Sequence, residues 1–254
     1  MEQDNKGRWK KLYSVNDCFF SEYNILSCYY AGLLAADGCV RNEKHFSLTQ
    51  SGKNKVLIES FIKDISYTGL IYKENPKNGK TSFRVSITSR KIVKDLEEKF
   101  NITTKKSLTL VPPEISEKNL TMSFIAGLID GDGSVGLYNF KGKDKKVPIV
   151  TVCGTLEIIQ WANNFINKEF PSIRRFKKQN KCRKLTQRNT YLISFSGARV
   201  VKLFLEMKKY NIPCSHKWDV IKNQIEKFGE SYYLDDHCCL KGRNRNGRFI
   251  KNIL

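Results

Sequence analysis

The feature that most constrains this chain is a nine-residue pattern that occurs twice. Residues 30–38 read YAGLLAADG, and residues 125–133 read IAGLIDGDG. Each copy places small residues four positions apart among large aliphatic ones and ends in Asp-Gly, so each predicts a short helix with one narrow small-residue face. Because similar segments follow both copies, we interpret the chain as an internal duplication.

The segments after each copy predict the same order of elements. Alternating polar and apolar residues indicate strands with one buried and one solvent-facing side, and amphipathic stretches indicate helices on the buried side. The first copy predicts strands near 40–41, 45–50, 70–74 and 82–88 and helices near 55–65 and 92–100. The second predicts strands near 134–140, 147–152, 173–178 and 190–196 and helices near 156–167 and 199–210. The expected fold class is α+β, with two pseudo-symmetric αββαββα halves.

The duplication also divides the chain. Pro112 and Pro113 mark the probable connection between the halves. The C-terminal tail is basic and poor in apolar residues, and it has two equal interpretations, an arm that lies on DNA or a solvated end. The predicted parts are an N-terminal extension (1–19), a first half (20–108), a linker (109–119), a second half (120–230) and the basic tail (231–254).

The small-residue faces predict that the two motif helices pack directly against each other. Small side chains let two helix backbones approach closely, whereas the paired aliphatic residues of each motif are expected to point into the core of their own half. One copy alone would be compatible with an ordinary alanine-containing helix, and the second copy favours a seam between the halves. The residues expected at this seam are Ala31, Gly32, Ala35, Ala126 and Gly127.

An acidic residue ends each of these helices. Asp37 and Asp132 lie where the helix dipole disfavours a carboxylate by a few tenths to about 1 kcal/mol, and Gly38 and Gly133 suit a left-handed C-terminal cap. An acid placed there twice suggests a cation that offsets the cost, and a divalent metal is the expected one. Such an ion can activate water and neutralise charge on a phosphodiester. Two acids at paired helix ends therefore predict two cleavage centres, one for each DNA strand.

Composition indicates a polyanionic partner. The 254 residues carry a formal net charge of +20, and 40% of them are hydrophobic. The apolar content supports a buried core, and the basic excess is typical of proteins that bind nucleic acid rather than small metabolites. A solvated basic surface or association with the ribosome is the alternative interpretation.

The eight cysteines lack the spacing of a metal site, because no two are arranged as CxxC and the close pair Cys238 and Cys239 is adjacent. We interpret them as free thiols in a reducing compartment. No apolar run reaches the roughly 18 residues needed to cross a membrane, and the N-terminal residues lack the apolar stretch of a secretory signal. We expect an intracellular protein, with phage or bacterial cytoplasm and an organelle matrix both left open.

Both nonapeptides resemble the signature of the LAGLIDADG homing endonucleases. The first matches that signature at six of nine positions and the second at seven, and the resemblance extends over about residues 20–228. It implies a single-chain enzyme with two motifs, whose saddle-shaped antiparallel sheets hold DNA while the strands are cut across the minor groove to leave 3′ overhangs. Members of this type act as monomers on long asymmetric double-stranded sites in intron or gene homing, and they require no protein partner and no membrane.

The resemblance implies metal ligands at the ends of both motifs. In the family the last acid of each motif binds the metal, for which we expect Mg²⁺. This role corresponds to Asp37 and Asp132, with the preceding Ala36 and Gly131 as further ligands. The earlier acid of the signature is present in only one motif, as Asp130, and is given no metal role.

Three further residues match catalytic positions of the family. Lys106 and Lys217 match its basic residue near the cleavage centre, where a lysine stabilises transition-state charge or polarises the attacking water. Lys105 is the alternative to Lys106. Gln50 matches a polar residue that orders water near the metal. The second half has Cys153-Gly154 at that place, which predicts unequal centres and leaves open which strand is cut first.

The solvent-facing strand positions predict the DNA-contacting surface. A two-stranded ribbon fits the major groove, where arginine reads guanine and glutamine reads adenine, and many contacts will be to phosphate or water. The basic loops 141–146 and 180–184 are expected to grip phosphates. The residues expected to face DNA are Arg41, Glu43, His45, Ser47, Tyr72, Arg84, Tyr138, Lys141, Lys143, Arg175, Lys177 and Gln179.

Two other functions are compatible with the same scaffold. One is an RNA maturase that assists intron splicing, and the other is a DNA-binding regulator that does not cut. The two retained acids favour the endonuclease, because a protein that only binds DNA has no use for two carboxylates beside phosphate.

Overall fold

The computed structural model describes residues 13–75, 79, 81–139, 146–171, 183–184 and 190–230. The strand predicted near 173–178 lies outside these residues. So do five of the residues predicted to face DNA, namely Lys141, Lys143, Arg175, Lys177 and Gln179.

The first half is one antiparallel sheet with helices on its apolar face. Its sheet has the strand order β1-β2-β4-β3. Along the chain its elements are α1 (Ile25–Asp37), β1 (Gly38–Asn42), β2 (His45–Ser51), the 3-10 turn η1 (Gly52–Asn54), α2 (Lys55–Asp64), β3 (Ile71–Glu74), β4 (Ser82–Thr88), α3 (Arg90–Phe100) and the short α4 (Lys106–Thr109).

The second half repeats this arrangement. Its antiparallel sheet has the order β5-β6-β8-β7, so the two sheets are topologically equivalent. Its elements are α5 (Lys118–Asp132), β5 (Ser134–Asn139), β6 (Lys146–Gly154), α6 (Leu156–Glu169), β7 (Arg183–Lys184), β8 (Tyr191–Ser196), α7 (Ala198–Lys209), the 3-10 turn η2 (His216–Trp218) and α8 (Asp219–Phe228). The predicted α+β class and the order within each half are confirmed, and α8 is an additional closing helix.

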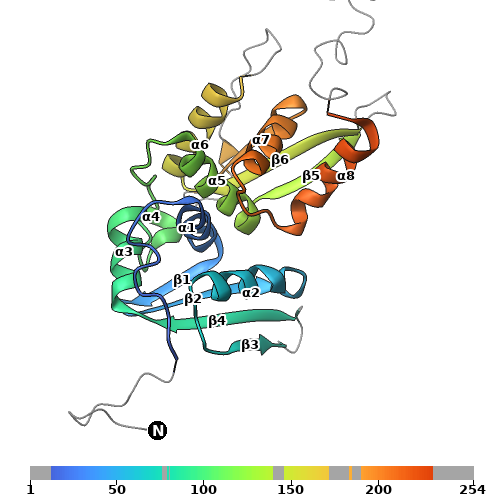
Figure 1. The fold of residues 1–254 in the computed structure, drawn as a ribbon. Coiled ribbons are helices and arrows are strands. Elements are labelled where there is room, and N and C mark those ends of the chain that lie inside the picture. Colours follow the sequence, from blue (N-terminus) through green and yellow to red (C-terminus); the bar gives the residue numbers. More distant parts are fainter. Residues whose placement is uncertain are drawn as a thin grey trace, which may run out of the picture.

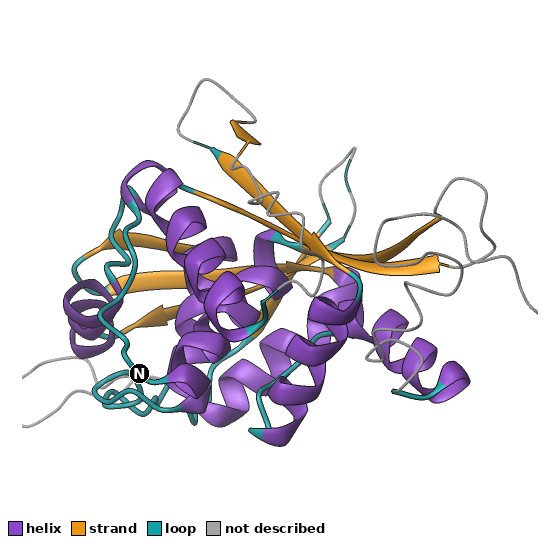
Figure 2. Cartoon of the chain, turned by 90° about the horizontal axis from the view of Figure 1, so that it is seen from above, coloured by secondary structure: helices purple, strands orange, loops and turns teal. Residues whose placement is uncertain are grey.

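Strand parity explains why the helices gather on one side of each sheet. Val85 and Ile87 of β4 and Val150 and Val152 of β6 are buried, and residues between them are more exposed. This alternation gives each sheet one apolar face, which must be covered. Figure 2 shows the described helices gathered on that side of the strands. The described helices leave the opposite face of each sheet uncovered (Figure 2).

Helices α1 and α5 lie side by side at the centre of the molecule and join the halves (Figure 1). Their backbones touch. A Cβ built on Gly32 would lie 2.0 Å from the carbonyl oxygen of Phe124, and one on Gly127 would lie 2.0 Å from that of Tyr29. The predicted seam therefore exists, with glycine required on both sides. Ala31, Ala35 and Ala126 of the predicted seam are also buried.

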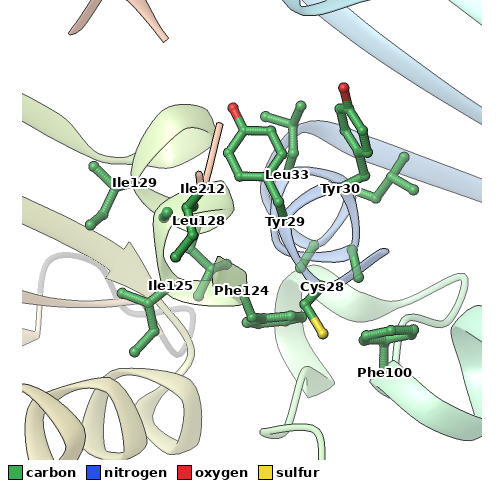
Figure 3. Packing of buried hydrophobic residues seen from close by; sticks show 14 of the residues in the cluster. Cys28, Tyr29, Tyr30, Leu33, Phe100, Phe124, Ile125, Leu128, Ile129 and Ile212 are labelled. Carbon is green, nitrogen blue, oxygen red and sulfur yellow. The ribbon is translucent and has the colours of Figure 1, made fainter. Parts of the chain in front are cut away.

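Large side chains surround this backbone contact. Figure 3 shows Leu33, Leu128 and Ile129 packed around the two helices, with Tyr29 and Phe124 between them. The hydroxyl of Ser123 on α5 donates a 2.6 Å hydrogen bond to the carbonyl of Ile25 on α1. One continuous core thus spans the two halves.

The predicted left-handed caps at Gly38 and Gly133 are wrong. Gly38 has φ −78° and ψ 159°, and Gly133 has φ −89° and ψ 176°, so both are extended and lead directly into β1 and β5. Glycine is needed there for space instead. A Cβ on Gly38 would lie 2.4 Å from the carbonyl oxygen of Leu34, and one on Gly133 would lie 2.7 Å from that of Ile129.

Two further expectations bear on the surroundings of the site. The cysteines in the described part of the chain (Cys18, Cys28, Cys39, Cys153 and Cys214) are all free thiols. Among the described helices, none combines the length and apolar character needed to span a membrane.

Candidate active site

The two motif acids lie at helix ends that contact each other. Asp37 is the last residue of α1, and Asp132 is the last residue of α5. A Cβ built on Gly131 would lie 2.3 Å from the Cβ of Ala36 and 3.2 Å from Oδ2 of Asp37. The close approach begun at Gly32 and Gly127 thus continues to the acids and brings two carboxylates together.

Asp37 is held by a relay of amide side chains. Gln50 Nε2 donates a 2.7 Å hydrogen bond to Oδ2 of Asp37, and Asn54 Nδ2 donates a 3.0 Å hydrogen bond to Oε1 of Gln50. Both amides are buried. The relay fixes one carboxylate oxygen of Asp37 and leaves the other oxygen available to a ligand.

The second half lacks this relay. In β1 and β2 Cys39 pairs with Ser47, and the equivalent pair in β5 and β6 is Ser134 with Thr151. Three residues further along, the position of Gln50 is taken by Gly154, which has no side chain. Asp132 is exposed, and no other side chain in the described ranges donates a hydrogen bond to it. The two motif acids therefore differ in their surroundings, since Asp37 is held by the Gln50 amide and Asp132 is exposed. Whether the two cleavage centres are unequal stays a prediction.

The two predicted catalytic lysines cap the two motif helices. Lys106 Nζ donates hydrogen bonds to the carbonyls of Ala35 (2.7 Å) and Ala36 (2.8 Å) at the end of α1. Lys217 Nζ donates to the carbonyls of Gly131 (2.7 Å), Gly133 (2.9 Å) and Ile129 (3.2 Å) at the end of α5. Each ammonium thus lies at the negative end of a helix dipole and binds terminal carbonyls, although the carbonyl of Ile129 also accepts a hydrogen bond from the backbone N–H of Gly133.

The structure also separates the two lysine candidates of the first half. The side chain of Lys106 is buried at the end of α1, whereas Lys105 is exposed. Lys106 is therefore the lysine that shares the site with Asp37.

The four charged groups influence one another. Burial raises the pKa of Asp37, and the nearby Asp132 raises it further, while Gln50, Lys217 and Lys106 oppose the rise. Burial lowers the pKa of Lys106 and of Lys217, and the two acids oppose this change in both lysines. Two carboxylates lie close together here, and one of them is buried. A divalent cation would stabilise their ionised forms.

The available donors fit a hard, hydrated cation. They are the carboxylates of Asp37 and Asp132 and the carbonyl oxygens near the helix ends, and all are oxygen atoms. Within the described part of the chain, no three His, Cys, Asp or Glu residues form a metal-binding group. Mg²⁺ is commonly held by only one or two carboxylates and keeps several waters, so this donor set suits it better than zinc. The predicted ligands Ala36 and Gly131 offer carbonyls that already accept hydrogen bonds from Lys106 and Lys217, and one lone pair remains on each.

Asp37→Asn is expected to raise the melting temperature of the metal-free protein at neutral pH. The pKa of Asp37 is raised in the fold, so the folded state holds the proton more tightly than the unfolded chain. Ionising this buried acid beside Asp132 therefore lowers the free energy of unfolding. This loss of stability is absent at a pH below 3.8, the ordinary pKa of the group, and complete at a pH above its raised pKa. Melting curves with a chelator from pH 3 to pH 8 test this sign. A variant that melts below the wild type at pH 7 would contradict it.

Solved structures have a similar fold. No family model and no curated protein sequence matches the chain. The I-LtrWI LAGLIDADG homing endonuclease bound to target DNA is 13% identical with a TM-score of 0.53, over 90% of this chain and 100% of that one. LAGLIDADG homing endonuclease I-GzeII in complex with its DNA target is 13% identical with a TM-score of 0.55, over 88% and 99%. Meganuclease I-SmaMI bound to uncleaveable DNA is 14% identical with a TM-score of 0.51, over 88% and 100%.

The chain has the LAGLIDADG homing endonuclease fold. The two motif helices of the chain form the joint between its halves, and the acids at their C-terminal ends lie close together. The expected saddle corresponds to the helix-free face of each sheet (Figure 2).

The first half presents five of the seven described residues that were predicted to face DNA. Arg41 and Glu43 are exposed in and after β1, and Tyr72 is 45% exposed on β3. His45 Nδ1 is 2.8 Å from Oγ1 of Thr88, and Arg84 forms a 3.1 Å ion pair with Glu74. In the second LAGLIDADG half, Tyr138 is half-buried on β5.

The prediction that Ser47 is exposed is wrong, since it is 3% exposed. It lies on β2, between Cys39 of β1 and Ser86 of β4. A short side chain on a central strand is covered by residues of the flanking strands, even when it lies on the solvent-facing side of the sheet.

The fold brings together residues that the motif did not identify. Tyr13 and Val15 of the predicted N-terminal extension line an open hollow of about 630 Å³ on the face of the first sheet, together with Arg41, His45 and Tyr72. Asn54 stands behind Gln50. A single asparagine at a helix start reads as an ordinary cap, so no sequence signal distinguished it.

Proposed function

We propose that this chain is a site-specific DNA endonuclease that hydrolyses one phosphodiester in each strand of a long asymmetric duplex, leaving staggered ends with 3′ overhangs. The observation that carries the proposal is the pairing of Asp37 and Asp132 at touching helix ends. Two adjacent carboxylates repel each other, and the core alone gives no reason to keep them. A divalent cation between the acids and DNA phosphates would relieve this repulsion.

The residues of each centre have separate roles in this proposal. A divalent cation held by Asp37 and Asp132, with the Ala36 and Gly131 carbonyls nearby, would supply activated water and neutralise charge on phosphorus. Gln50 keeps the carboxylate of Asp37 in one orientation. In this proposal Lys106 and Lys217 place positive charge beside the developing negative charge of the transition state.

The two sheets supply the DNA-binding surface. Both come from one chain and differ in their side chains, so the monomer would read an asymmetric site without a protein partner. The structural neighbours support this assignment, because I-LtrWI and I-GzeII are bound to their DNA targets. I-SmaMI, with a TM-score of 0.50, is bound to an uncleaved target in the presence of calcium ions, which supports a divalent metal.

A selection for cleaved sequences from a random duplex library tests the proposed function directly. Incubation with Mg²⁺ should release fragments that share one long asymmetric sequence, with 3′ overhangs of constant length. The same library with a chelator is the control. Recovery of bound but uncut duplex would contradict the proposal and favour a regulator that does not cleave, and preferential binding of structured RNA would favour a maturase.

DNA binding is expected to weaken steeply as salt increases. The net charge of +20 implies many phosphate contacts, and each contact releases condensed counterions from the duplex. With six to ten such contacts, affinity should fall by about 10³ to 10⁵ between 50 mM and 200 mM salt. Titrations of labelled duplex in Ca²⁺ at several salt concentrations measure the slope. A slope near zero would show that the basic excess lies away from the DNA.

A further inference from the structure

Asp130 is a fully buried carboxylate that the proposed chemistry does not use. Its side chain accepts four hydrogen bonds. Oδ2 accepts from the hydroxyl of Tyr29 (2.7 Å) and the backbone N–H of Ser215 (2.8 Å), and Oδ1 accepts from the hydroxyl of Ser215 (2.6 Å) and the indole N–H of Trp218 (2.9 Å). A buried charge is tolerated only when it is paired or hydrogen-bonded in this way.

These donors bracket Lys217. Ser215 precedes the η2 turn that carries Lys217, and Trp218 ends it. The backbone N–H of Lys217 also donates to the hydroxyl of Ser215 (3.3 Å), which itself binds Asp130. The backbone around Lys217 is therefore attached to α5 through Asp130.

The ammonium of Lys217 is attached to the same stretch of α5. Its partners include the carbonyls of Ile129 and Gly131, the two neighbours of Asp130. The turn is thus attached to α5 in two ways. Ser215 and Trp218 bind the side chain of Asp130, and the side chain of Lys217 binds backbone carbonyls of α5. Losing the first attachment would leave the contact between the turn and the end of α5 to the flexible four-carbon side chain of Lys217.

No equivalent device occurs among the described residues of the first half. Ala35 occupies the position of Asp130 in the first motif. Lys106 is carried by α4, and its backbone N–H donates to the carbonyl of Thr103 within the same local turn. A substitution at Asp130 should therefore affect the centre that contains Lys217 and leave the centre that contains Lys106 unchanged.

We propose that Asp130 is a positioning residue that holds the Ser215–Trp218 turn so that Lys217 lies beside Asp132 in the second centre. The proposal rests on the endonuclease function and assigns to Asp130 a task in the cleavage of one strand only. Asparagine cannot replace it, because an amide offers one acceptor oxygen and turns an NH₂ group toward donors.

A strand-resolved cleavage assay separates positioning from simple stabilisation. The two strands of the duplex carry different end labels, and the nicking rate of each is followed on a denaturing gel for Asp130→Asn and Ser215→Ala. Both variants should slow one strand, by about 10- to 100-fold for Asp130→Asn since a shift of about 1 Å can have that effect. The affected strand should be the one slowed by Lys217→Met. Equal slowing of both strands, or of neither, would overturn the proposal.

Adjacent tyrosines provide a matched control. Tyr29 donates to Asp130, and Tyr30 donates a 2.6 Å hydrogen bond to Oδ2 of Asp64 within the first half. Figure 3 shows both hydroxyls pointing to the same side of the helix pair. Tyr29→Phe should slow the same strand as Asp130→Asn but less, and Tyr30→Phe should leave the ratio of the two nicking rates unchanged. A shift of that ratio in Tyr30→Phe alone would contradict the proposal.

Amide hydrogen exchange tests the positioning without DNA. In Asp130→Asn, exchange at Ser215, Lys217 and Trp218 should be faster than in the wild type, and in Tyr30→Phe it should be unchanged. Unaltered exchange in Asp130→Asn would overturn the inference even if the wild type cuts DNA. If the wild type cuts no duplex, the proposed function fails, and the exchange rates still decide whether Asp130 holds the turn.

Discussion

Asp37→Asn and Asp132→Asn are each expected to abolish double-strand cleavage while DNA binding survives. Either change removes one of the two carboxylates at the touching helix ends and with it half of the acidic ligand charge of the site. The shape is preserved, and at Asp37 the amide oxygen can still accept the hydrogen bond from Gln50. Loss of one such electrostatic contact typically lowers a rate by about 10² to 10³, and losing a metal ligand should cost at least as much.

The measurement combines cleavage in Mg²⁺ with gel-shift binding in Ca²⁺. Glu98→Gln is a charge-matched control, because Glu98 and Lys94 form an ion pair on the exposed surface of α3. It should bind and cut like the wild type. Full double-strand cleavage by either aspartate variant would remove the basis for the metal site.

Gly127→Leu is expected to cost more activity than stability. A Cβ on Gly127 would lie 2.0 Å from the carbonyl oxygen of Tyr29 and 2.7 Å from the backbone nitrogen of Leu33, so the helices must separate. Overpacking typically costs about 1–3 kcal/mol, whereas a displacement of catalytic groups by about 1 Å can lower a rate about a hundredfold. Separation of the helices also moves Asp37 away from Asp132, so the variant should bind DNA poorly and make no double-strand breaks.

Melting temperature and cleavage rate are measured together for this variant and for Gly127→Ala, which meets the same two backbone atoms. Gly136→Ala on β5 is the matched control, since a Cβ there meets nothing within 4 Å. It should keep both the stability and the rate of the wild type. Wild-type cleavage by the leucine variant would show that α1 and α5 do not pack through this face.

The fold could be predicted from the sequence because duplication and periodicity act locally. Alternation in 82–88 predicted β4 to the residue, and the small residues of both motifs predicted the α1–α5 seam. The conformations of Gly38 and Gly133 could not be predicted in the same way. Asp-Gly at a helix end is compatible with a left-handed cap. Only the extended backbone conformation after each helix, which brings the Cβ position against Leu34 or Ile129 four residues earlier, shows that close contact rather than backbone handedness requires glycine.

The site could be predicted only where the motif names its residues. Asp37 and Asp132 follow from the repeat, and Lys106 and Lys217 from the resemblance to the family. The network at Asp130 could not be foreseen, because Tyr29 and Ser215 reach it from distant parts of the chain. The burial of Ser47 could not be predicted either. The alternation along a strand gives the face on which a side chain lies, but not how far the neighbouring side chains cover it.

The backbone contact at Gly32 and Gly127 also bears on how such a protein can be redirected to new DNA. The separation of the two acids is set by peptide groups that already touch, and not by any side chain on the sheets. Residues on the open faces can therefore be exchanged, to suit a different run of base pairs, without altering the distance between the two cuts. In the proposed endonuclease, recognition and cutting geometry would thus be independent variables, and an engineer or a diverging lineage could change the first while inheriting the second.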